Sequence, residues 1–300
     1  MNIFNQLIVT LLPFVPKSIV ARFARPYIAG KTREEAVSTV KAINKAGAMA
    51  TVDVLGEDIT TREEATAARD ECKRVLDAIT LNTLDSNISI KLTQLGLKID
   101  MGFCHSNVEE ILDAARSKNN FVRIDMEDHT CTDDTLTIFH EASKKYSNVG
   151  IVVQAYLKRS ESDIRLLGGE RSNVRLCKGI YNEAPEIAFK KKEEIQENYL
   201  RLLKILFDAQ CYVGIATHDD VLIDGAKAMI RERNLRKNQY EFQMLLGVRN
   251  EKRKELVRDG HRLRIYTPYG ERWYAYSVRR LKENPQMAGY VFKSMFGMNN

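Results

Sequence analysis

The chain has 300 residues, of which 44% are hydrophobic and 29% are charged. This composition is typical of a globular, soluble protein and excludes a disordered or fibrous chain. The net charge of +6 comes from 46 basic and 40 acidic residues. Opposite charges lie three or four positions apart in segments such as 190–197, which is typical of solvated helix faces, so no nucleic-acid partner is expected.

The cysteines and the N-terminal segment indicate the cellular compartment in which the protein is expected. The five cysteines are odd in number and form no CxxC pair, which argues against a disulfide framework and indicates a reducing compartment, the cytoplasm. Residues 7–15 are apolar, but Pro13 interrupts them and they are too short to span a bilayer. No Lys or Arg precedes them, so the charged start of a secretory signal is missing. We expect a helix packed on the domain, with contact at the inner face of the cell membrane as the alternative.

Residues 1–46 are expected to form two or three helices, with breaks at Gly30 and at 44–47, that pack on a catalytic barrel of residues 47–300. Gly30-Lys31-Thr32 resembles the end of a phosphate-binding P-loop, but Arg25 stands where that motif needs glycine. No G-x-G-x-x-G occurs either, so a dinucleotide would not be held in the Rossmann manner.

Eight short apolar runs, rich in β-branched residues, predict strands. They are Val52–Leu55, Ile88–Leu92, Phe121–Asp125, Gly150–Ala155, Val174–Gly179, Val213–His218, Glu241–Gly247 and Leu263–Pro268. Segments with helical apolar spacing lie between them, as in 188–206. Alternating strands and helices predict parallel pairing through right-handed crossovers. Eight such units predict an α/β fold of the (β/α)8 TIM-like barrel type, with an open doubly wound sheet as the alternative.

Polar residues stand near the carboxyl ends of seven predicted strands, where barrels carry their catalytic groups. They are Lys91, Asp125, Gln154, Arg175, Lys178, Thr217, His218, Gln243 and Tyr266. A charged side chain inside an apolar run is costly to bury without a partner. Lys91, Asp125 and Arg175 at equivalent places in three strands therefore indicate a site. The alternative is a buried ion-pair network that only fixes the barrel.

A second group of residues follows the last predicted strand. Residues 273–283 (WYAYSVRRLKE) predict a helix, on which Arg279 and Arg280 follow Tyr276 by three and four positions. Glu283 follows the two arginines by four and three positions. Two adjacent guanidinium groups can converge on one carboxylate or phosphate. The alternative is an ordinary solvated helix face with i,i+4 pairs.

Six motifs in this order carry a family resemblance. They are Ile90-Lys91-Leu92-Thr93, Val153-Gln154-Ala155-Tyr156 with Lys158-Arg159, Arg175-Leu176-Cys177-Lys178-Gly179-Ile180-Tyr181, Ala216-Thr217-His218, Glu241-Phe242-Gln243-Met244-Leu245 and Tyr276-Ser277-Val278-Arg279-Arg280-Leu281-Lys282-Glu283-Asn284. Together they resemble the proline dehydrogenase family in its short monofunctional bacterial form, over residues 30–300. The resemblance implies a distorted (β/α)8 barrel, with its last helix over the carboxyl face, that binds FAD without a Rossmann unit. It also implies oxidation of L-proline to Δ1-pyrroline-5-carboxylate, the first step of proline catabolism, with hydride passing from proline C5 to FAD and electrons onward to a membrane quinone.

Roles for individual residues follow from the same resemblance, and no metal ion is among them. Arg279 and Arg280 would clamp the proline carboxylate together with Lys91, and Asp125 would orient that cluster. The substrate ring would lie against Tyr181, Leu245, Tyr266 and Tyr276. FAD would be held by Gln154, Arg175, Lys178, Gly179, Thr217, His218 and Gln243. Glu283, grouped with the flavin residues, would pair with the arginines and help close the last helix. The expected catalytic residues are Arg175, near the reactive edge of the flavin, with Lys91 and Asp125.

The chain departs from the family pattern in places. Asn182 follows Tyr181 where the long bifunctional members have an aromatic residue, so flavin stacking there is expected to differ. His218 is followed by Asp219-Asp220 rather than the usual Asn. The chain lacks the DNA-binding module and the aldehyde dehydrogenase domain of the long members. The resemblance therefore implies a separate pyrroline-5-carboxylate (glutamate semialdehyde) dehydrogenase as the enzyme that takes the product.

Three other classes of function compete with this interpretation. A Schiff-base lyase, aldolase-like in its chemistry, would use Lys91 or Lys178 as its amine. A metal hydrolase would use the acidic segment 125–134, which has suitable ligands but no recognised metal-binding spacing. A non-catalytic binding protein would show no turnover, but it seldom needs so many buried charges.

Overall fold

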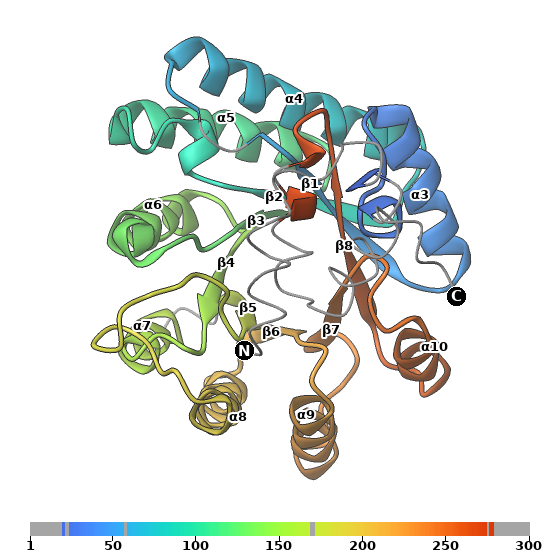
Figure 1. The fold of residues 1–300 in the computed structure, drawn as a ribbon, viewed down its shortest axis with the longest axis vertical. Helices are drawn as coiled ribbons and strands as arrows, with labels where there is room; N and C mark the ends of the chain where they lie inside the picture. The colour runs from blue at the N-terminus through green and yellow to red at the C-terminus, as the bar shows by residue number, and fades with distance from the viewer. Residues whose placement is uncertain (1–19, 22–23, 57–58, 169–171, 275, 279–300) are drawn as a thin grey trace, which may run out of the picture.

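The computed structural model describes residues 20–21, 24–56, 59–168, 172–274 and 276–278. Within them, eight parallel strands close a barrel in the order β1 to β8, and helices surround it (Figure 1). The strands are β1 Met49–Val54, β2 Ser86–Ile90, β3 Val122–Ile124, β4 Val149–Gln154, β5 Asn173–Cys177, β6 Tyr212–Ala216, β7 Tyr240–Leu245 and β8 Leu263–Tyr269. The predicted (β/α)8 barrel is confirmed, and the open sheet is excluded because β1 pairs with both β2 and β8.

The helices begin where the sequence supplies caps. The α-helices are α3 Arg33–Lys45, α4 Arg62–Leu81, α5 Met101–Ser117, α6 Thr132–Lys145, α7 Ser160–Gly168, α8 Lys192–Asp208, α9 Asp220–Glu232 and α10 Asn250–Arg258, and short 3-10 turns lie at Arg25–Tyr27, Thr93–Leu95 and His129–Cys131. Thr32 and Glu35 form a capping box at the start of α3, and the carboxylate of Asp100 accepts the Phe103 N–H at the start of α5. Each such cap satisfies backbone donors that the helix itself leaves free, and contributes about 1 kcal/mol.

Helix α3 completes the ring of helices between β8 and β1. It contacts both strands and lies beside α4, with α10 on its other side (Figure 1). In a regular barrel the helix that follows β8 would occupy this place. Here the place belongs to a helix that precedes β1. Of the chain after β8, Trp273, Tyr274 and residues 276–278 are described and helical, in agreement with the predicted start at Trp273.

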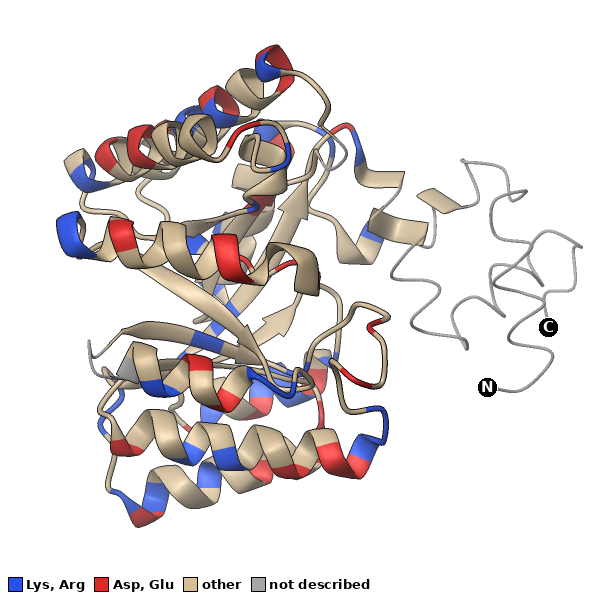
Figure 2. Ribbon diagram, turned by 90° about the vertical axis from the view of Figure 1, so that its left-hand side faces the viewer, with Lys and Arg blue, Asp and Glu red and all other residues tan. Residues whose placement is uncertain are grey.

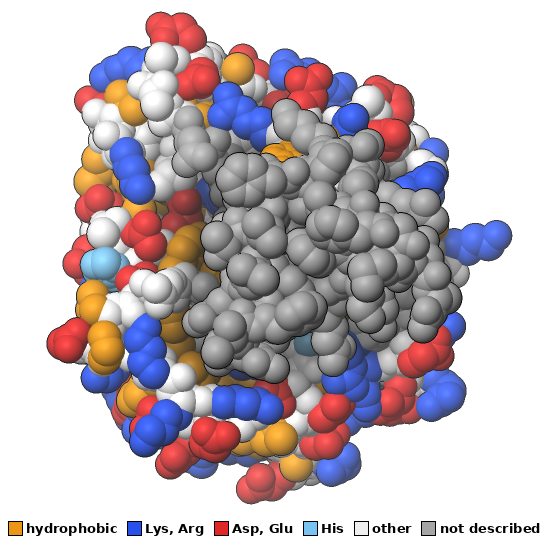
Figure 3. Space-filling model, in the orientation of Figure 1, with side chains coloured by type: hydrophobic (Ala, Val, Ile, Leu, Met, Phe, Trp, Pro, Cys, Tyr) orange, Lys and Arg blue, Asp and Glu red, His pale blue; other side chains and the backbone are white. Residues whose placement is uncertain are grey.

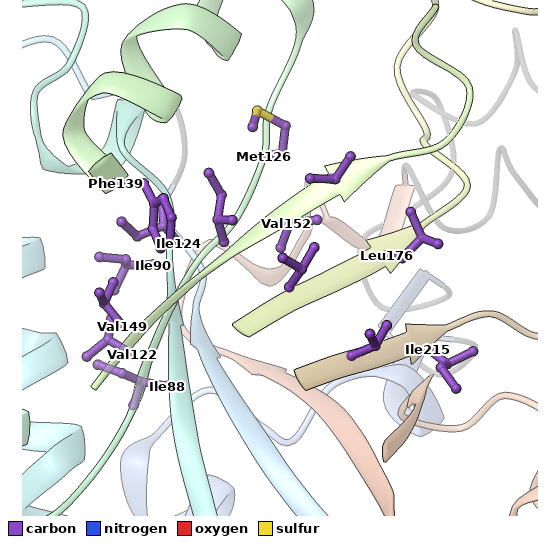
Figure 4. Close-up of a cluster of buried hydrophobic side chains, with 14 of the residues drawn as sticks. Ile88, Ile90, Val122, Ile124, Met126, Phe139, Val149, Val152, Leu176 and Ile215 are labelled. Atoms are coloured by element: carbon purple, nitrogen blue, oxygen red, sulfur yellow. The ribbon is translucent and has the colours of Figure 1, made fainter. Parts of the chain in front are cut away.

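The two faces of the strands differ sharply. Outward side chains such as Ile88, Ile90, Val122 and Ile124 pack against the helices, for example beside Phe139 of α6 (Figure 4). A fully buried side chain of this size contributes roughly 1.5–3 kcal/mol, so this layer is where the fold gains its stability. The alternate, inward positions are mostly polar. They include Thr51, Asp53, Asn87, Ser89, Arg123, Asp125, Asn173, Arg175, Glu241, Gln243, Arg264 and Tyr266. Their burial requires partners inside the barrel.

The outer surface carries both signs of charge. Lys, Arg, Asp and Glu are interspersed along the helices (Figure 2) and around the face seen in Figure 3. All five cysteines are free thiols, as predicted. Among the described helices, none has the length and apolar character needed to cross a bilayer.

Candidate active site

Six side chains meet inside the barrel near the carboxyl ends of its strands. We call them the strand-end cluster: Asp53, Ser89, Lys91, Asp125, Arg175 and Tyr266. They come from β1, β2, β5 and β8 and from the residues directly after β2 and β3. All are buried except Tyr266, which is partly exposed. The cluster therefore forms at the end of the barrel where parallel strands of this fold carry catalytic groups.

Asp125 is the acceptor at the centre of the strand-end cluster. Its Oδ1 accepts a hydrogen bond from Nη1 of Arg175 at 2.7 Å and from Oγ of Ser89 at 3.0 Å. Its Oδ2 accepts from the phenol of Tyr266 at 2.7 Å. One carboxylate thus fixes both the guanidinium of Arg175 and the hydroxyl of Tyr266.

Lys91 carries the second positive charge. Its Nζ lies 2.6 Å from Oδ1 of Asp53, 3.3 Å from the Tyr266 hydroxyl and 3.8 Å from Oδ2 of Asp125. Two cations and two carboxylates balance in the buried cluster, and removing one of them would leave a buried charge uncompensated. Asp53 was not predicted. Its signal was the same as that of Lys91, a charged residue inside an apolar strand.

The electrostatics keep donors and acceptors in fixed roles. Burial, reinforced by Asp125 and Asp53, raises the pKa of Tyr266 well above its ordinary value, so the phenol remains a hydrogen-bond donor at neutral pH. Burial also raises the pKa of Asp53, while the Lys91 ammonium opposes that shift and Asp125 reinforces it. A carboxyl so placed depends on Lys91 to hold its charge.

Arg175 has one donor to spare. Nη1 binds Asp125 and Nη2 donates to Ser89 Oγ at 3.1 Å, but the buried Nε has no partner among the described residues. The guanidinium carbon lies 5.3 Å from the centre of the Tyr266 ring. Buried donors in proteins are nearly always satisfied. The unsatisfied Nε therefore marks a position for an acceptor group on a bound molecule.

The other predicted residues near β4 to β7 make contacts of their own. Gln154 Nε2 donates to the Glu127 carbonyl at 2.8 Å, and Gln243 Nε2 donates to Glu241 Oε1 at 2.7 Å. Lys178 Nζ lies 3.3 Å from a carboxylate oxygen of Asp219. These three side chains lie outside the hydrogen bonds of the strand-end cluster.

Thr217 and His218 follow β6. Thr217 Oγ1 accepts the Asp219 N–H at 3.2 Å, and His218 Nε2 accepts the Leu245 N–H at 2.9 Å. The second bond ties the end of β7 to the segment after β6 and fixes half-buried Leu245. Tyr276 is buried in the described turn of helix after β8. The predicted residues Arg279, Arg280 and Glu283 lie outside the described residues.

Gly179, two residues after the end of β5, has a backbone conformation that other residues rarely adopt. Its φ is +104°, and an added Cβ would lie 2.0 Å from the ring of Tyr156. Tyr181, two residues on, packs partly buried against Tyr156 and its neighbours. The close approach brings the loop after β5 directly against the end of β4, which a side chain at position 179 would prevent.

A contact between His129 and Glu183 joins the loops after β3 and β5, and the sequence analysis did not predict it. Glu183, buried in the loop after β5, accepts the His129 N–H at 2.9 Å and lies 2.5 Å from Nδ1 of the same histidine. Glu127 instead accepts from Thr93, and Asp128 caps the turn at Thr130. The acidic residues proposed above as metal ligands are thus divided among separate partners rather than gathered at one point.

Comparisons with known proteins fit this geometry. The model of the proline dehydrogenase family matches residues 36–292. The chain is 39% identical to proline dehydrogenase 1 of Bacillus subtilis subsp. natto, over 91% of this chain and 90% of that protein. It is 35% identical to the proline dehydrogenase of Deinococcus radiodurans, over 91% and 89%.

A solved structure shares the fold. It is proline utilization A from Bdellovibrio bacteriovorus inactivated by N-propargylglycine, with a TM-score of 0.85 and 26% identity. The match covers 94% of this chain but 36% of that much longer one. The likeness in sequence extends over nearly the whole length of the short relatives, as expected for a monofunctional form. The chain belongs to the proline dehydrogenase family.

Proposed function

We propose that the protein oxidises L-proline to Δ1-pyrroline-5-carboxylate at the strand-end cluster, with FAD as its cofactor and proline C5 as the source of the hydride. This is the first step of proline catabolism. The observation that carries the proposal is that buried Lys91, Asp125 and Arg175 are bonded together with Tyr266 near the carboxyl ends of strands, in a chain of this family. When bound, FAD would supply the hydride acceptor, which no side chain can provide.

The residues present fit a flavin. The unsatisfied Nε of Arg175 is a buried, positively charged donor, and the ring nitrogens and carbonyl oxygens of a flavin are acceptors. The residues expected to hold it lie on or directly after β4 to β7: Gln154 ends β4, Lys178 and Gly179 follow β5, Thr217 and His218 follow β6, and Gln243 lies within β7. We assign them, with Arg175 and Glu283, to holding the cofactor.

The cluster also suits a zwitterionic substrate. Lys91 is held by Asp53 at 2.6 Å, and its ammonium would bind the proline carboxylate together with Arg279 and Arg280. Tyr181, Leu245, Tyr266 and Tyr276 would surround the ring. Asp125 keeps Arg175 and Tyr266 in place throughout, because it bonds to both. We therefore assign Lys91, Asp125 and Arg175 as the catalytic residues.

The missing Rossmann motif argues against NAD as the electron acceptor. We propose a membrane quinone, reached from the cytoplasm by contact at the inner face of the membrane, and a separate pyrroline-5-carboxylate dehydrogenase for the product. The Schiff-base alternative needs a neutral amine. The Lys91 amine instead contacts two carboxylates, with Nζ 2.6 Å from Asp53 Oδ1 and 3.8 Å from Asp125 Oδ2.

Turnover with matched lysine variants tests this function. The purified protein should reduce an artificial dye or a soluble quinone when L-proline is added, and o-aminobenzaldehyde should trap the product, whereas NAD should not be reduced. Lys91→Met should reduce kcat/KM for proline at least tenfold, because a charged contact to the carboxylate is lost.

Lys227→Met is the control. Lys227 is also largely buried and bound to two carboxylates, Glu255 at 3.1 Å and Asp259 at 3.0 Å, but it lies on α9, away from the strand-end cluster. This variant should keep its turnover. Proline-dependent NAD reduction at the rate of the dye, or equal turnover in the two variants, would overturn the proposal.

A further inference from the structure

The opposite end of the barrel holds a pocket that the proposed reaction does not use. It has a volume of about 660 Å³ and opens where six strands begin. The strand starts that line it include Ser86, Arg123, Asn173, Tyr212, Glu241 and Arg264. Because all eight strands are parallel, this entrance and the strand-end cluster lie at opposite ends of the barrel. We call it the amino-end pocket.

The lining of the amino-end pocket has an excess of positive charge. Four cations line it, Lys118, Arg123, Arg262 and Arg264, against two carboxylates, Asp85 and Glu241. Two of the cations are already neutralised. Arg264 lies 2.7 Å from Glu241, and Lys118 lies 3.0 Å from Asp77.

The remaining two cations, Arg123 and Arg262, have no carboxylate partner among the described residues. Nη1 of Arg123 donates to the carbonyls of Ile151 at 2.9 Å and Asn173 at 2.6 Å, and Nη2 donates to the side-chain oxygen of Asn173. Its buried Nε has no partner among the described residues. Arg262 donates to the sulfur of Met49 at 3.2 Å and lies 6.0 Å from the Tyr212 ring. A sulfur and a ring face are weak partners for a guanidinium.

The free-energy cost of burying a cation without a paired carboxylate falls mainly on Arg123, which is 2% exposed. Burial, with Arg175 and Arg264 nearby, lowers the pKa of Arg123 to about 9, although Glu241 and Asp125 oppose the shift. A buried cation that is not directly paired with a carboxylate is destabilising, and proteins normally supply such a partner. The missing negative charge can come from a ligand.

We propose that the amino-end pocket is a second binding site, one that takes a small oxyanion, carboxylate or phosphate, on Arg262 and Arg123. Guanidinium groups bind both kinds of anion through paired, charge-assisted hydrogen bonds. Arg264 and Glu241 form the fixed wall of the site, because they satisfy each other. Asp85, the other carboxylate of the lining, is exposed to solvent, whereas Arg123 is buried.

Calorimetric titration tests the site directly. The probes are inorganic phosphate and succinate, added to the purified full-length protein in a buffer free of other oxyanions, with chloride as the control for ionic strength. At least one probe should bind saturably with one site per chain. Arg262→Gln should weaken that binding about tenfold or more, because one charged donor pair is removed. Arg165→Gln, which changes an exposed arginine on α7, should leave it unchanged.

The same titration on Lys91→Met separates this site from the strand-end cluster, which the proposed function also equips to bind a carboxylate. Binding that survives Lys91→Met and is weakened by Arg262→Gln supports the amino-end site, and the preferred probe identifies phosphate or carboxylate. Absence of saturable binding for both probes overturns the site. So does binding that Lys91→Met removes, or binding that Arg262→Gln leaves unchanged in a folded variant. None of these results depends on turnover, so they stand apart from the test of the proposed reaction.

Discussion

At the scale of single residues, the strand-end cluster owes its geometry to the carboxylate of Asp125 and the phenol of Tyr266. Asp125 receives three donors, and Tyr266 stays protonated because burial and two carboxylates raise its pKa. The Tyr266 hydroxyl also accepts from Lys91. The phenol therefore links the two cations of the cluster through hydrogen bonds rather than through charge.

Tyr266→Phe tests that link. The ring remains beside Arg175, but the bonds to Asp125 and Lys91 are lost, and Asp125 keeps an unsatisfied oxygen. We expect kcat/KM for proline to fall about tenfold, because a hydrogen bond to a charged group contributes about 1.5–3 kcal/mol. Cofactor content should stay normal. Steady-state kinetics and an absorption spectrum provide both measurements.

Tyr212→Phe is the matched control. It removes a phenol that donates to a buried carboxylate, Glu241, at 2.8 Å, but at the other end of the barrel. It should lower the free energy of unfolding without changing kcat/KM. An equal kinetic loss in both variants would mean that the Tyr266 bond acts only through the stability of the barrel.

Sequence reasoning found the charged residues that interrupt apolar strands near their carboxyl ends, namely Lys91, Asp125 and Arg175. It missed Asp53, which carries the same signal in β1, because a partner for it becomes visible only when β1 and β2 pair. Arg123 was missed for a similar reason. It lies two positions before Asp125, which follows β3, so both side chains point into the barrel. The sequence does not indicate the contacts of Arg123 with Asn173 and Ile151.

At the scale of elements, all eight strands were predictable because each is a short apolar run between helical segments. The position of α3 was not. The pattern of alternation places a helix after β8, yet α3, which precedes β1, covers β8 and β1. Which helix covers β8 and β1 depends on tertiary packing, which the apolar stripe of a single helix does not specify.

Gly179→Ala tests how β5 and its loop are held. The added methyl would meet the Tyr156 ring, and alanine is strained at a φ of +104°. Strain of this kind costs about 1–2 kcal/mol, and displacement of Tyr156 adds to it. We expect a lower free energy of unfolding in denaturant and a lower flavin occupancy, because the loop after β5 would move away from β4.

Gly102→Ala serves as its control. Gly102 lies in the first turn of α5, where an added Cβ would come no closer than 3.4 Å to Asp100. Alanine should leave the stability unchanged or raise it by up to about 1 kcal/mol. Flavin occupancy should not change. If Gly179→Ala changed neither the stability nor the flavin occupancy, the close approach of the loop after β5 to Tyr156 would have no role in holding the site.

At the scale of the whole molecule, a polar network fills the barrel and links its stability to pH. Glu241 is buried, and its bonds with Arg264 outweigh the effect of burial and lower its pKa from 4.5 to about 2. A carboxyl whose pKa is lowered on folding contributes stability that is present above its unfolded pKa and is lost as pH falls through the folded pKa. Here the window runs from about pH 4.5 down to about pH 2, and the shift corresponds to about 3 kcal/mol.

Comparison with Glu241→Gln isolates this contribution. At pH 7 the variant should be less stable by about 3–5 kcal/mol, because Arg264 loses its buried partner. The difference in the free energy of unfolding between the wild type and Glu241→Gln should become smaller as pH falls below 4.5, because Glu241 itself becomes protonated in the wild type. Glu251→Gln, an exposed change on α10, should show little gap at any pH. Denaturant unfolding at several pH values measures both differences in the free energy of unfolding. A difference for Glu241→Gln that does not change with pH would contradict the lowered pKa of Glu241.

The most direct test of the account is an anaerobic absorption spectrum of the purified protein before and after addition of L-proline. The account predicts flavin bands in the protein as isolated, and their loss when proline is added in the absence of any other acceptor. Lys91→Met should lose the bands far more slowly, because the charged contact to the proline carboxylate is missing. A colourless protein that still turns over proline, or a bound flavin that stays oxidised in the presence of proline, would contradict it.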